Sequence, residues 1–206
     1  MLLTYNRMKE ALIIFVRKPV LGKVKTRIAA SVGDEVAIAI YNKLLRHTHK
    51  ITSPLSCKKF VFYADAIDDN DLWNDGYQKR LQADGDLGSK MKSAFAYLFN
   101  TGYSRICIVG SDCYELTTAI IEQAFYLLNK NEIVLGPAKD GGYYLLGMKD
   151  NMKDVFEGIE WSTSEVLQQT LSHIQKNLYT YSMLDELKDM DTINDVPDEW
   201  LQIFNL

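Results

Sequence analysis

The sequence predicts an α/β protein of three layers, in which helices cover both faces of a mostly parallel, mixed sheet. Short apolar runs alternate along the chain with longer segments whose apolar residues recur at helical spacing. The join between the apolar runs 133–135 and 143–146 is too short for a crossover helix, so these strands are expected to be antiparallel or separated. We expect a single domain over residues 1–206, because no linker, repeat or low-complexity tract interrupts the chain.

Seven segments have the composition of strands. The first is a continuous apolar run with β-branched members, which is typical of a strand buried on both faces. Its six residues are too few to span a membrane, and no small-residue cleavage site follows, so we expect no signal peptide. The predicted strands are residues 11–16, 59–64, 81–83, 106–109, 132–136, 142–148 and 177–182.

Helices are predicted where apolar residues recur every three or four positions and a capping residue stands at the start. Ser89 and Thr117 are placed to cap two of them. The polar segment 65–79, rich in Asp and Asn, is the expected mobile loop. The predicted helices are residues 34–50, 89–100, 117 to about 130, a segment beginning at 162 or 163, and a short tail after Pro197.

The composition favours a cytoplasmic enzyme that acts on small molecules. The formal charge of −4 argues against binding a nucleic acid polymer by bulk electrostatics. Three cysteines without metal-ligand spacing indicate a reducing compartment and no disulfide framework. No apolar segment is long enough for a membrane span, and nothing in the sequence indicates the oligomeric state.

The first candidate site follows the first strand, in the segment 17–28, RKPVLGKVKTRI. Four cations lie around Gly22, which permits a sharp turn, and a helix is expected to follow. Such a loop is a natural phosphate site, although a solvated basic loop explains the charges equally well. It is not a Walker A loop, since Val24 follows Gly22 and Lys23. The four candidate phosphate ligands are Lys18, Lys23, Lys25 and Arg27.

The second candidate is Asp112, in the segment 106–116, ICIVGSDCYEL. This carboxylate follows a predicted central strand, and ligands of open α/β sheets bind outside the carboxyl ends of the strands. An Asp in this place suits Mg²⁺, which takes one or two protein carboxylates together with substrate phosphates. The alternative is that Asp112 caps a turn or a helix.

The third candidate is the turn between two apolar runs in the segment 136–147, GPAKDGGYYLLG. Asp140 can accept hydrogen bonds or take a proton. Gly141 and Gly142 at the head of a strand suggest that something approaches the backbone closely. A tight turn between buried strands would explain this segment alone, but three polar segments at strand ends together favour a ligand site.

Three further segments carry weaker signals. Gly85, Asp86 and Gly88 precede a helix and would lie over a nucleotide base or ribose, unless they form a plain connecting loop. Asp191 would supply a second carboxylate to the metal, unless its segment is a solvated turn. Trp161 and Ser162 would form a wall of an acceptor pocket, unless the tryptophan belongs to the core.

Together these motifs resemble one bacterial family. The order KxPxxGxVKTR, GDLGxxM, GSDC, GPAxDGGYYLLG, WST and DxDT, over about residues 11–195, is similar to the GT-A-fold, nucleotide-diphospho-sugar-transferase-like proteins of the DUF2064 type. These are often labelled arsenosugar-biosynthesis glycosyltransferases, and the phospholactate guanylyltransferases are more distantly similar. The family usually has proline where this chain has Tyr114, so the loop is expected to be freer here and the direction of Asp112 is left open.

The resemblance implies a transferase that uses a nucleoside diphosphate sugar, a small-molecule acceptor and a divalent metal, Mg²⁺ or Mn²⁺. Asp112 and Asp191 would hold the metal, and Asp140 would act on the acceptor hydroxyl or position the donor sugar. One alternative is a nucleotidyltransferase acting on a phosphorylated acceptor, and another is a catalytically silent nucleotide-binding protein. The expected substrate pocket comprises Gly141, Gly142, Tyr143, Trp161 and Ser162.

Overall fold

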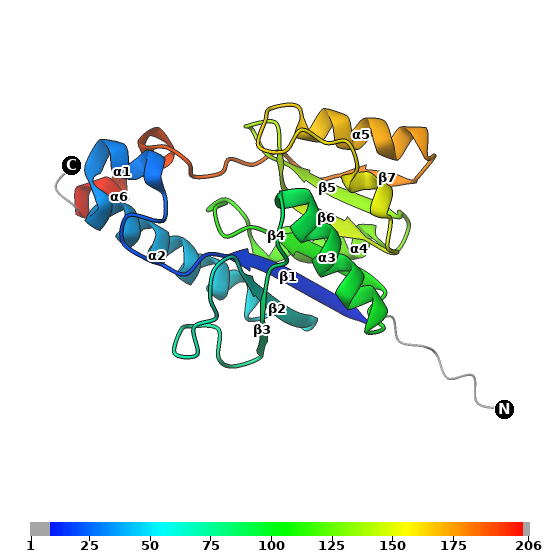
Figure 1. The fold of residues 1–206 in the computed structure, drawn as a ribbon, viewed down its shortest axis with the longest axis horizontal. Coiled ribbons are helices and arrows are strands. Elements are labelled where there is room, and N and C mark those ends of the chain that lie inside the picture. The colour runs from blue at the N-terminus through cyan, green and yellow to red at the C-terminus, as the bar shows by residue number, and fades with distance from the viewer. Residues whose placement is uncertain (1–8, 204–206) are drawn as a thin grey trace.

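The structure, a computed structural model, describes residues 9–203 and contains one seven-stranded sheet (Figure 1). The strands lie in the order β3-β2-β1-β4-β6-β5-β7. The middle of the sheet is formed by apolar runs that the sequence predicts as strands. The strands are β1 (Glu10–Val16), β2 (Lys58–Tyr63), β3 (Tyr77–Leu81), β4 (Arg105–Val109), β5 (Ile133–Pro137), β6 (Tyr143–Met148) and β7 (Tyr181–Met183).

The sheet is mixed, as predicted. Strand β1 pairs in parallel with β2 and β4, and β2 pairs in parallel with β3. Strand β6 alone runs the other way and lies between β4 and β5, antiparallel to both. The short join between β5 and β6 therefore makes an antiparallel pair of neighbours, which is the first of the two predicted arrangements.

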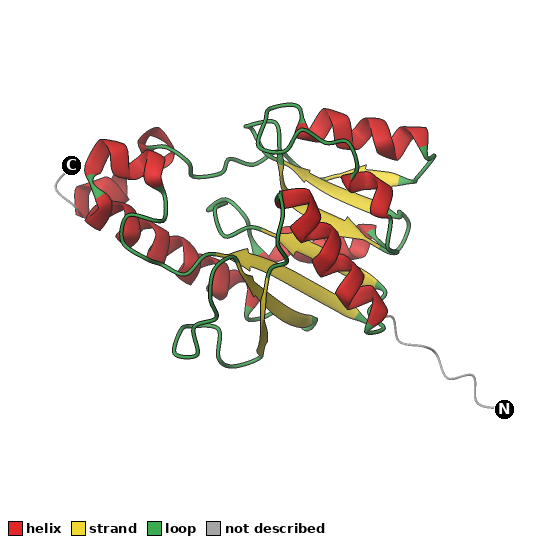
Figure 2. Cartoon of the chain, viewed as in Figure 1, coloured by secondary structure: helices red, strands yellow, loops and turns green. Residues whose placement is uncertain are grey.

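Helices cover both faces of the sheet, so the predicted three layers are confirmed (Figure 2). Alternate residues of β1 point to opposite faces: Leu12 and Ile14 pack with α2 (Asp34–Thr52) and α4 (Thr118–Leu127), whereas Ala11 and Ile13 pack with α3 (Leu87–Asn100). None of the helices within residues 9–203 is both long and apolar enough to cross a membrane. The α-helices are α1 (Thr26–Val32), α2 (Asp34–Thr52), α3 (Leu87–Asn100), α4 (Thr118–Leu127), α5 (Val166–Lys176) and α6 (Asp198–Ile203), with 3-10 turns at Lys153–Phe156 and Ile193–Asp195.

The start of α3 differs from the prediction. Asp86 caps this helix, because its side chain accepts a hydrogen bond from the Ser89 N–H at 2.8 Å. Ser89 was expected to be the cap and instead lies in the first turn. The other predicted cap is confirmed: the Thr117 side chain accepts from the Ile120 N–H at the start of α4.

The edge strand β3 and the start of helix α5 also differ from the prediction. Strand β3 lies at Tyr77–Leu81 rather than 81–83, so the polar segment 65–79 ends inside the sheet. That segment is tied to the body by buried Trp73 and by the Asp71–Lys79 ion pair at 2.8 Å. Helix α5 begins at Val166, because residues 161–165 form a turn before it.

Candidate active site

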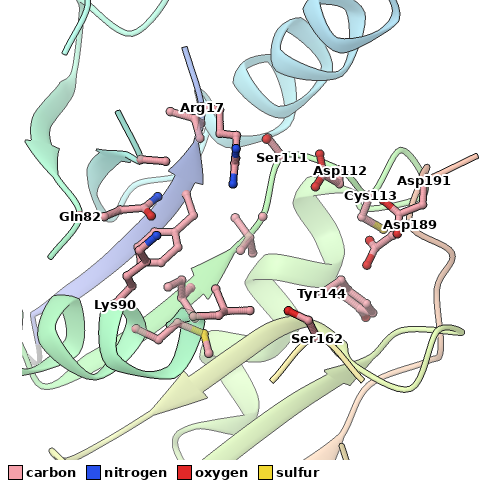
Figure 3. A pocket seen from close by; sticks show the side chains of 18 of the residues that line it. Arg17, Gln82, Lys90, Ser111, Asp112, Cys113, Tyr144, Ser162, Asp189 and Asp191 are labelled. Atoms are coloured by element: carbon pink, nitrogen blue, oxygen red, sulfur yellow. The ribbon is translucent and has the colours of Figure 1, made fainter. Parts of the chain in front are cut away.

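A cavity of about 700 Å³ opens at the carboxyl ends of β1 and β4 (Figure 3). Strands β1 and β4 are neighbours and parallel, so the segments that follow them meet at the same edge of the sheet. One of these segments carries the basic loop and the other carries Asp112. Figure 3 shows carboxylates at one end of the cavity and Arg17, Gln82 and Lys90 at the other.

At the acidic end, one ammonium group joins two carboxylates. The Lys25 Nζ lies 2.9 Å from an Asp112 oxygen and 3.5 Å from an Asp191 oxygen, and it donates to the Met190 carbonyl at 2.8 Å. The Lys25 side chain is only 7% exposed, whereas those of Asp112 and Asp191 are 46% and 40% exposed. The two carboxylates are therefore the more exposed partners in the cavity wall, and the lysine side chain is buried against them.

Two carboxylates that contact one cationic group can also contact a metal ion. Within residues 9–203 no three His, Cys, Asp or Glu side chains form a ready metal site. Magnesium needs fewer, because it usually takes one or two carboxylates and completes its shell with water and substrate phosphates. Asp112 and Asp191 fit this requirement, since both reach the position of a single ammonium group.

Of the other three predicted phosphate ligands in the basic loop, two line the cavity and one does not. Lys23 and Arg27 line the cavity with Lys25. The Arg27 side chain is 76% exposed and lies 3.6 Å from Asp191, so it can turn to a ligand at little cost. Lys18 is not among the lining residues and instead pairs with Asp68 at 3.2 Å.

A third carboxylate, Asp189, lines the same end of the cavity, and no role was predicted for it from the sequence. Burial raises the pKa of Asp189 to about 7, and the negative charges of Asp112, Asp140 and Asp191 add to the rise against the opposing charge of Lys25. The only signal in the sequence was the repetition of Asp on either side of Met190. Asp189 therefore keeps its proton to a higher pH than an ordinary aspartate does.

We expect Asp189→Asn to stabilise the protein at high pH and not at low pH. The folded-state pKa of about 7 lies above the unfolded value of about 3.9, so the unfolded chain releases this proton first. The contribution of Asp189 to wild-type stability therefore falls as pH rises from about 4 to 7, and the amide removes this loss. In EDTA at pH 8 the melting temperature of the variant should rise by about 2–4 °C or more, the shift that 1 kcal/mol gives in a chain of this size.

The matched control for this prediction is Asp185→Asn, since Asp185 is an exposed carboxylate of the same segment. It should leave the pH dependence of the melting temperature unchanged. If Asp189→Asn shifted the melting temperature equally at pH 4 and pH 8, the burial of its charge would not be the cause.

The opposite end of the cavity presents two free cations and one amide oxygen. Gln82 is fixed by two hydrogen bonds: its N–H donates to the Tyr63 carbonyl at 2.9 Å, and its Nε2 donates to the Phe62 carbonyl at 3.0 Å. Its Oε1 is therefore left to accept from a ligand. Lys90 and Arg17 make no ion pair with any residue from 9 to 203.

Gly85 and Asp86, which the sequence predicts as nucleotide contacts, line the cavity, whereas Gly88, predicted with them, does not and instead packs against Trp161. None of the three side chains at the opposite end of the cavity, Arg17, Gln82 and Lys90, was predicted to bind a ligand. The available signal was their position, because one directly follows β1 and the other two flank the GDLG motif.

Tyr41, on α2, ties the two strand ends together. Its hydroxyl lies 2.9 Å from the Arg17 N–H, donates to the Arg17 carbonyl at 3.1 Å and lies 3.5 Å from the Ser111 hydroxyl. Burial raises the pKa of Tyr41 to about 12, so the group stays a neutral phenol. This contact fixes the start of the basic loop relative to the loop that carries Asp112.

The turn that contains Gly141 and Gly142 packs against the backbone of the segment before α5. Gly141 has a φ of +90°, and a Cβ added there would lie 2.1 Å from the Ser164 carbonyl oxygen. The Gly141 carbonyl also accepts from the Leu167 N–H at 2.9 Å. Asp140 accepts from the Gly142 N–H at 2.9 Å, which closes the turn. The turn is thus locked to the segment that leads into α5.

Only some of the residues that were expected to form the substrate pocket line the cavity. Tyr143 and Ser162 line the cavity, whereas Asp140, Gly141, Gly142 and Trp161 are not among its lining residues. Trp161 packs on Gly88, where a Cβ would lie 2.3 Å from its ring. Both glycines therefore allow the segment 161–164 to approach, and this segment presents Ser162, with φ 65°, to the cavity.

The fold and the position of the cavity define the class of protein. The mixed α/β sheet matches the fold of a protein provisionally assigned as a nucleotide-diphospho-sugar transferase, and its cavity lies at the carboxyl ends of the strands, where open α/β sheets bind ligands. Residues 48–163, more than half of the chain, match the family described as "Uncharacterized protein conserved in bacteria (DUF2064)". The chain belongs to this family, as the motifs predict.

Solved structures agree with this assignment. A protein from Desulfovibrio desulfuricans G20, provisionally assigned as a nucleotide-diphospho-sugar transferase, is 30% identical with a TM-score of 0.83, covering 90% of this chain and 84% of its own. The inositol-1-phosphate CTP transferase of T. maritima is 13% identical, with a TM-score of 0.60 and coverage of 96% and 95%. Rv0371c of Mycobacterium tuberculosis H37Rv, solved with manganese, is 11% identical, with a TM-score of 0.58 and coverage of 95% and 98%.

The last two likenesses show the fold alone. None of the curated proteins is significantly similar to the chain.

Proposed function

We propose that this protein is a divalent-cation-dependent transferase that moves a sugar from a nucleoside diphosphate to a small-molecule acceptor. The observation that carries the proposal is the convergence of Lys25, Asp112 and Asp191 in a cavity at the strand ends. The likeness to the D. desulfuricans protein supports the nucleotide-sugar donor.

In this proposal the cationic end of the cavity receives the nucleoside. Gln82 Oε1 accepts from the base, and Lys90 and Arg17 donate to it or to the ribose, because lysine and arginine have only donors. Gly85 and Asp86 form the adjoining rim. The diphosphate then extends toward the acidic end, where Lys23, Lys25 and Arg27 donate charge-assisted hydrogen bonds to it.

Asp112 and Asp191 would hold Mg²⁺ or Mn²⁺. When bound, such an ion neutralises the charge that develops on the leaving diphosphate. Without a ligand, Lys25 neutralises the two carboxylates itself. When a cation takes over this task, the Lys25 ammonium is released to donate to phosphate. The basic loop and the carboxylates therefore act as one unit.

On the acceptor side, Asp140 orients or deprotonates the acceptor hydroxyl, or positions the donor sugar. Asp140 lies in the turn between β5 and β6, and Tyr143, three residues further along, lines the cavity. Tyr143 and Ser162 form the lining beside it, and Gly141, Gly142 and Trp161 support that lining from behind. Positioning and charge neutralisation supply most of the rate in such a site.

A second candidate is nucleotidyl transfer to a phosphorylated acceptor. Three cations of one loop, Lys23, Lys25 and Arg27, line the cavity and would suit a triphosphate. Against it, the chain lacks the glycine-rich loop after the first strand in which sugar nucleotidyltransferases of this fold resemble one another.

The product of the reaction separates the two. We expect release of a nucleoside diphosphate when the protein is incubated with pooled nucleotide sugars, nucleoside triphosphates, Mn²⁺ and a cell extract as acceptor source. Asp140→Ala should lower this release about 100-fold or more, the scale of a lost general base, while largely sparing diphosphate binding. Asp150→Ala, an exposed carboxylate beyond the far end of β6, is the control. Pyrophosphate release sensitive to Asp140→Ala would instead establish nucleotidyl transfer.

A further inference from the structure

We propose that Tyr114 is a positioning residue, whose ring holds the C-terminal carboxylate segment against the loop that carries Asp112. The C-terminal segment is defined as residues 187–203. The inference rests on the proposed function, because it concerns how Asp112 and Asp191 are kept together. It assigns a task to the residue that stands where the sequence resemblance led us to expect proline.

The Tyr114 ring lies between two other aromatic rings from different elements. Its centroid is 4.7 Å from that of His47, on α2, and 4.7 Å from that of Trp200, on α6. The Trp200 ring meets it edge-on at 69° and carries the Lys43 ammonium 4.4 Å from its centroid. Tilted and edge-on aromatic pairs at such separations are attractive beyond their burial of area.

His47 is held in place by a hydrogen bond to the loop after β4. Its Nε2 lies 3.0 Å from the Leu116 carbonyl, two residues beyond Tyr114. Burial lowers the pKa of His47, so at neutral pH the ring is uncharged and donates Nε2–H to that carbonyl. The loop after β4 is therefore anchored to α2 through both its backbone and the Tyr114 ring.

The C-terminal segment docks on the same loop at two more points. The Met190 N–H donates to the Asp112 carbonyl at 2.9 Å, and the Lys188 N–H donates to Glu115 at 2.8 Å. Met190 and Trp200 are buried in one apolar cluster, against which Tyr114 packs. Asp191 lies between these anchors, so its carboxylate stays opposite that of Asp112.

The sequence alone suggested the opposite. Replacing proline by tyrosine was expected to free the loop and leave Asp112 without a defined direction. The structure shows that side-chain packing on His47 and Trp200 holds the residue in place instead. A tyrosine fixes the loop by contact with the C-terminal segment, whereas a proline would fix only its own backbone.

The test measures Mn²⁺ binding and local opening in four proteins. Free Mn²⁺ is followed by electron paramagnetic resonance during titration of wild type, Tyr114→Phe, Tyr114→Ala and Leu44→Ala, at a temperature at which all are folded. Tyr114→Phe is the conservative variant, because the Tyr114 hydroxyl makes no hydrogen bond to any residue from 9 to 203. Leu44→Ala destabilises the same buried cluster but removes none of the three stacked rings.

We expect Tyr114→Ala to weaken Mn²⁺ binding about tenfold and to speed hydrogen exchange of the Met190 amide at least as much. Tyr114→Phe should match wild type in both, and Leu44→Ala should lower the melting temperature without weakening Mn²⁺ binding. If Tyr114→Ala changed only the melting temperature, as Leu44→Ala does, the positioning role would be wrong.

The two readouts separate this inference from the proposed function. A wild-type protein that bound no Mn²⁺ would overturn the proposed cation site. In that case the Met190 exchange rate would still decide whether Tyr114 holds the C-terminal segment, because this readout needs no metal.

Discussion

Lys25→Ala is expected to have the largest effect on ligand binding of any single substitution in the cavity. The ammonium group would be lost as a phosphate ligand, and a charge-assisted hydrogen bond to phosphate is worth about 1.5–3 kcal/mol. Affinity for a nucleoside diphosphate should therefore fall roughly 10- to 150-fold. Affinity for the bare nucleoside should hardly change, because the nucleoside contacts the other end of the cavity. Isothermal titration with each ligand measures both.

The same substitution should change how the protein responds to a divalent cation. Without Lys25, Asp112 loses its ion-pair partner and Asp191 keeps only the exposed Arg27 guanidinium. Breaking a buried pair costs about 3–5 kcal/mol, and the partial exposure of these carboxylates reduces the expected loss to about 1–3 kcal/mol. A cation that fits between them should restore this stability, so Mn²⁺ should raise the melting temperature more in Lys25→Ala than in wild type.

Two variants complete that experiment. Arg27→Ala is the matched control, because its side chain is 76% exposed and its loss should cost little stability. The double variant Lys25→Ala, Asp112→Asn should lose the extra response to Mn²⁺. Equal weakening of nucleoside and diphosphate in Lys25→Ala, with no response to Mn²⁺, would show that the lysine is only structural.

The fold was predictable because its central strands are encoded locally. Segments such as β1 and β4 are buried on both faces and read as continuous apolar runs. The edge strand β3 is not, since Tyr77–Leu81 has one neighbour and mostly polar residues. Its pairing with β2 decides its position, and no local pattern in the sequence reports that pairing.

The candidate site was predictable in location and less so in its contacts. Parallel strand ends converge, so polar residues after β1 and β4 had to meet. Which groups pair depends on packing over long sequence distances. Lys25 and Asp191 are 166 residues apart, and only the folded chain shows that the predicted phosphate ligand contacts both predicted metal ligands. Gln82 and Asp189 were missed for the same reason.

Gly141 shows how the turn motif and the cavity are mechanically connected. The residue has a φ of +90°, and its Cα faces the backbone carbonyl of Ser164 at a separation that leaves no room for a Cβ. Because the obstructing atoms belong to backbone rather than to a flexible side chain, the clash cannot be relieved by a rotamer change. The segment 161–164, which presents Ser162 to the cavity, must shift if a side chain is placed there.

We therefore expect Gly141→Ala to be the most destabilising substitution in this turn, by about 3 kcal/mol or more. Backbone strain and overpacking each cost about 1–3 kcal/mol. The control is Gly142→Ala, whose φ is ordinary and whose Cβ would lie 3.2 Å from an Asp140 side-chain oxygen that can move. It should cost less than about 1 kcal/mol. Urea unfolding of the three proteins measures both values. Equal stability of the two variants would mean that the Ser164 contact yields easily, and the segment before α5 would then be free to move independently of the turn.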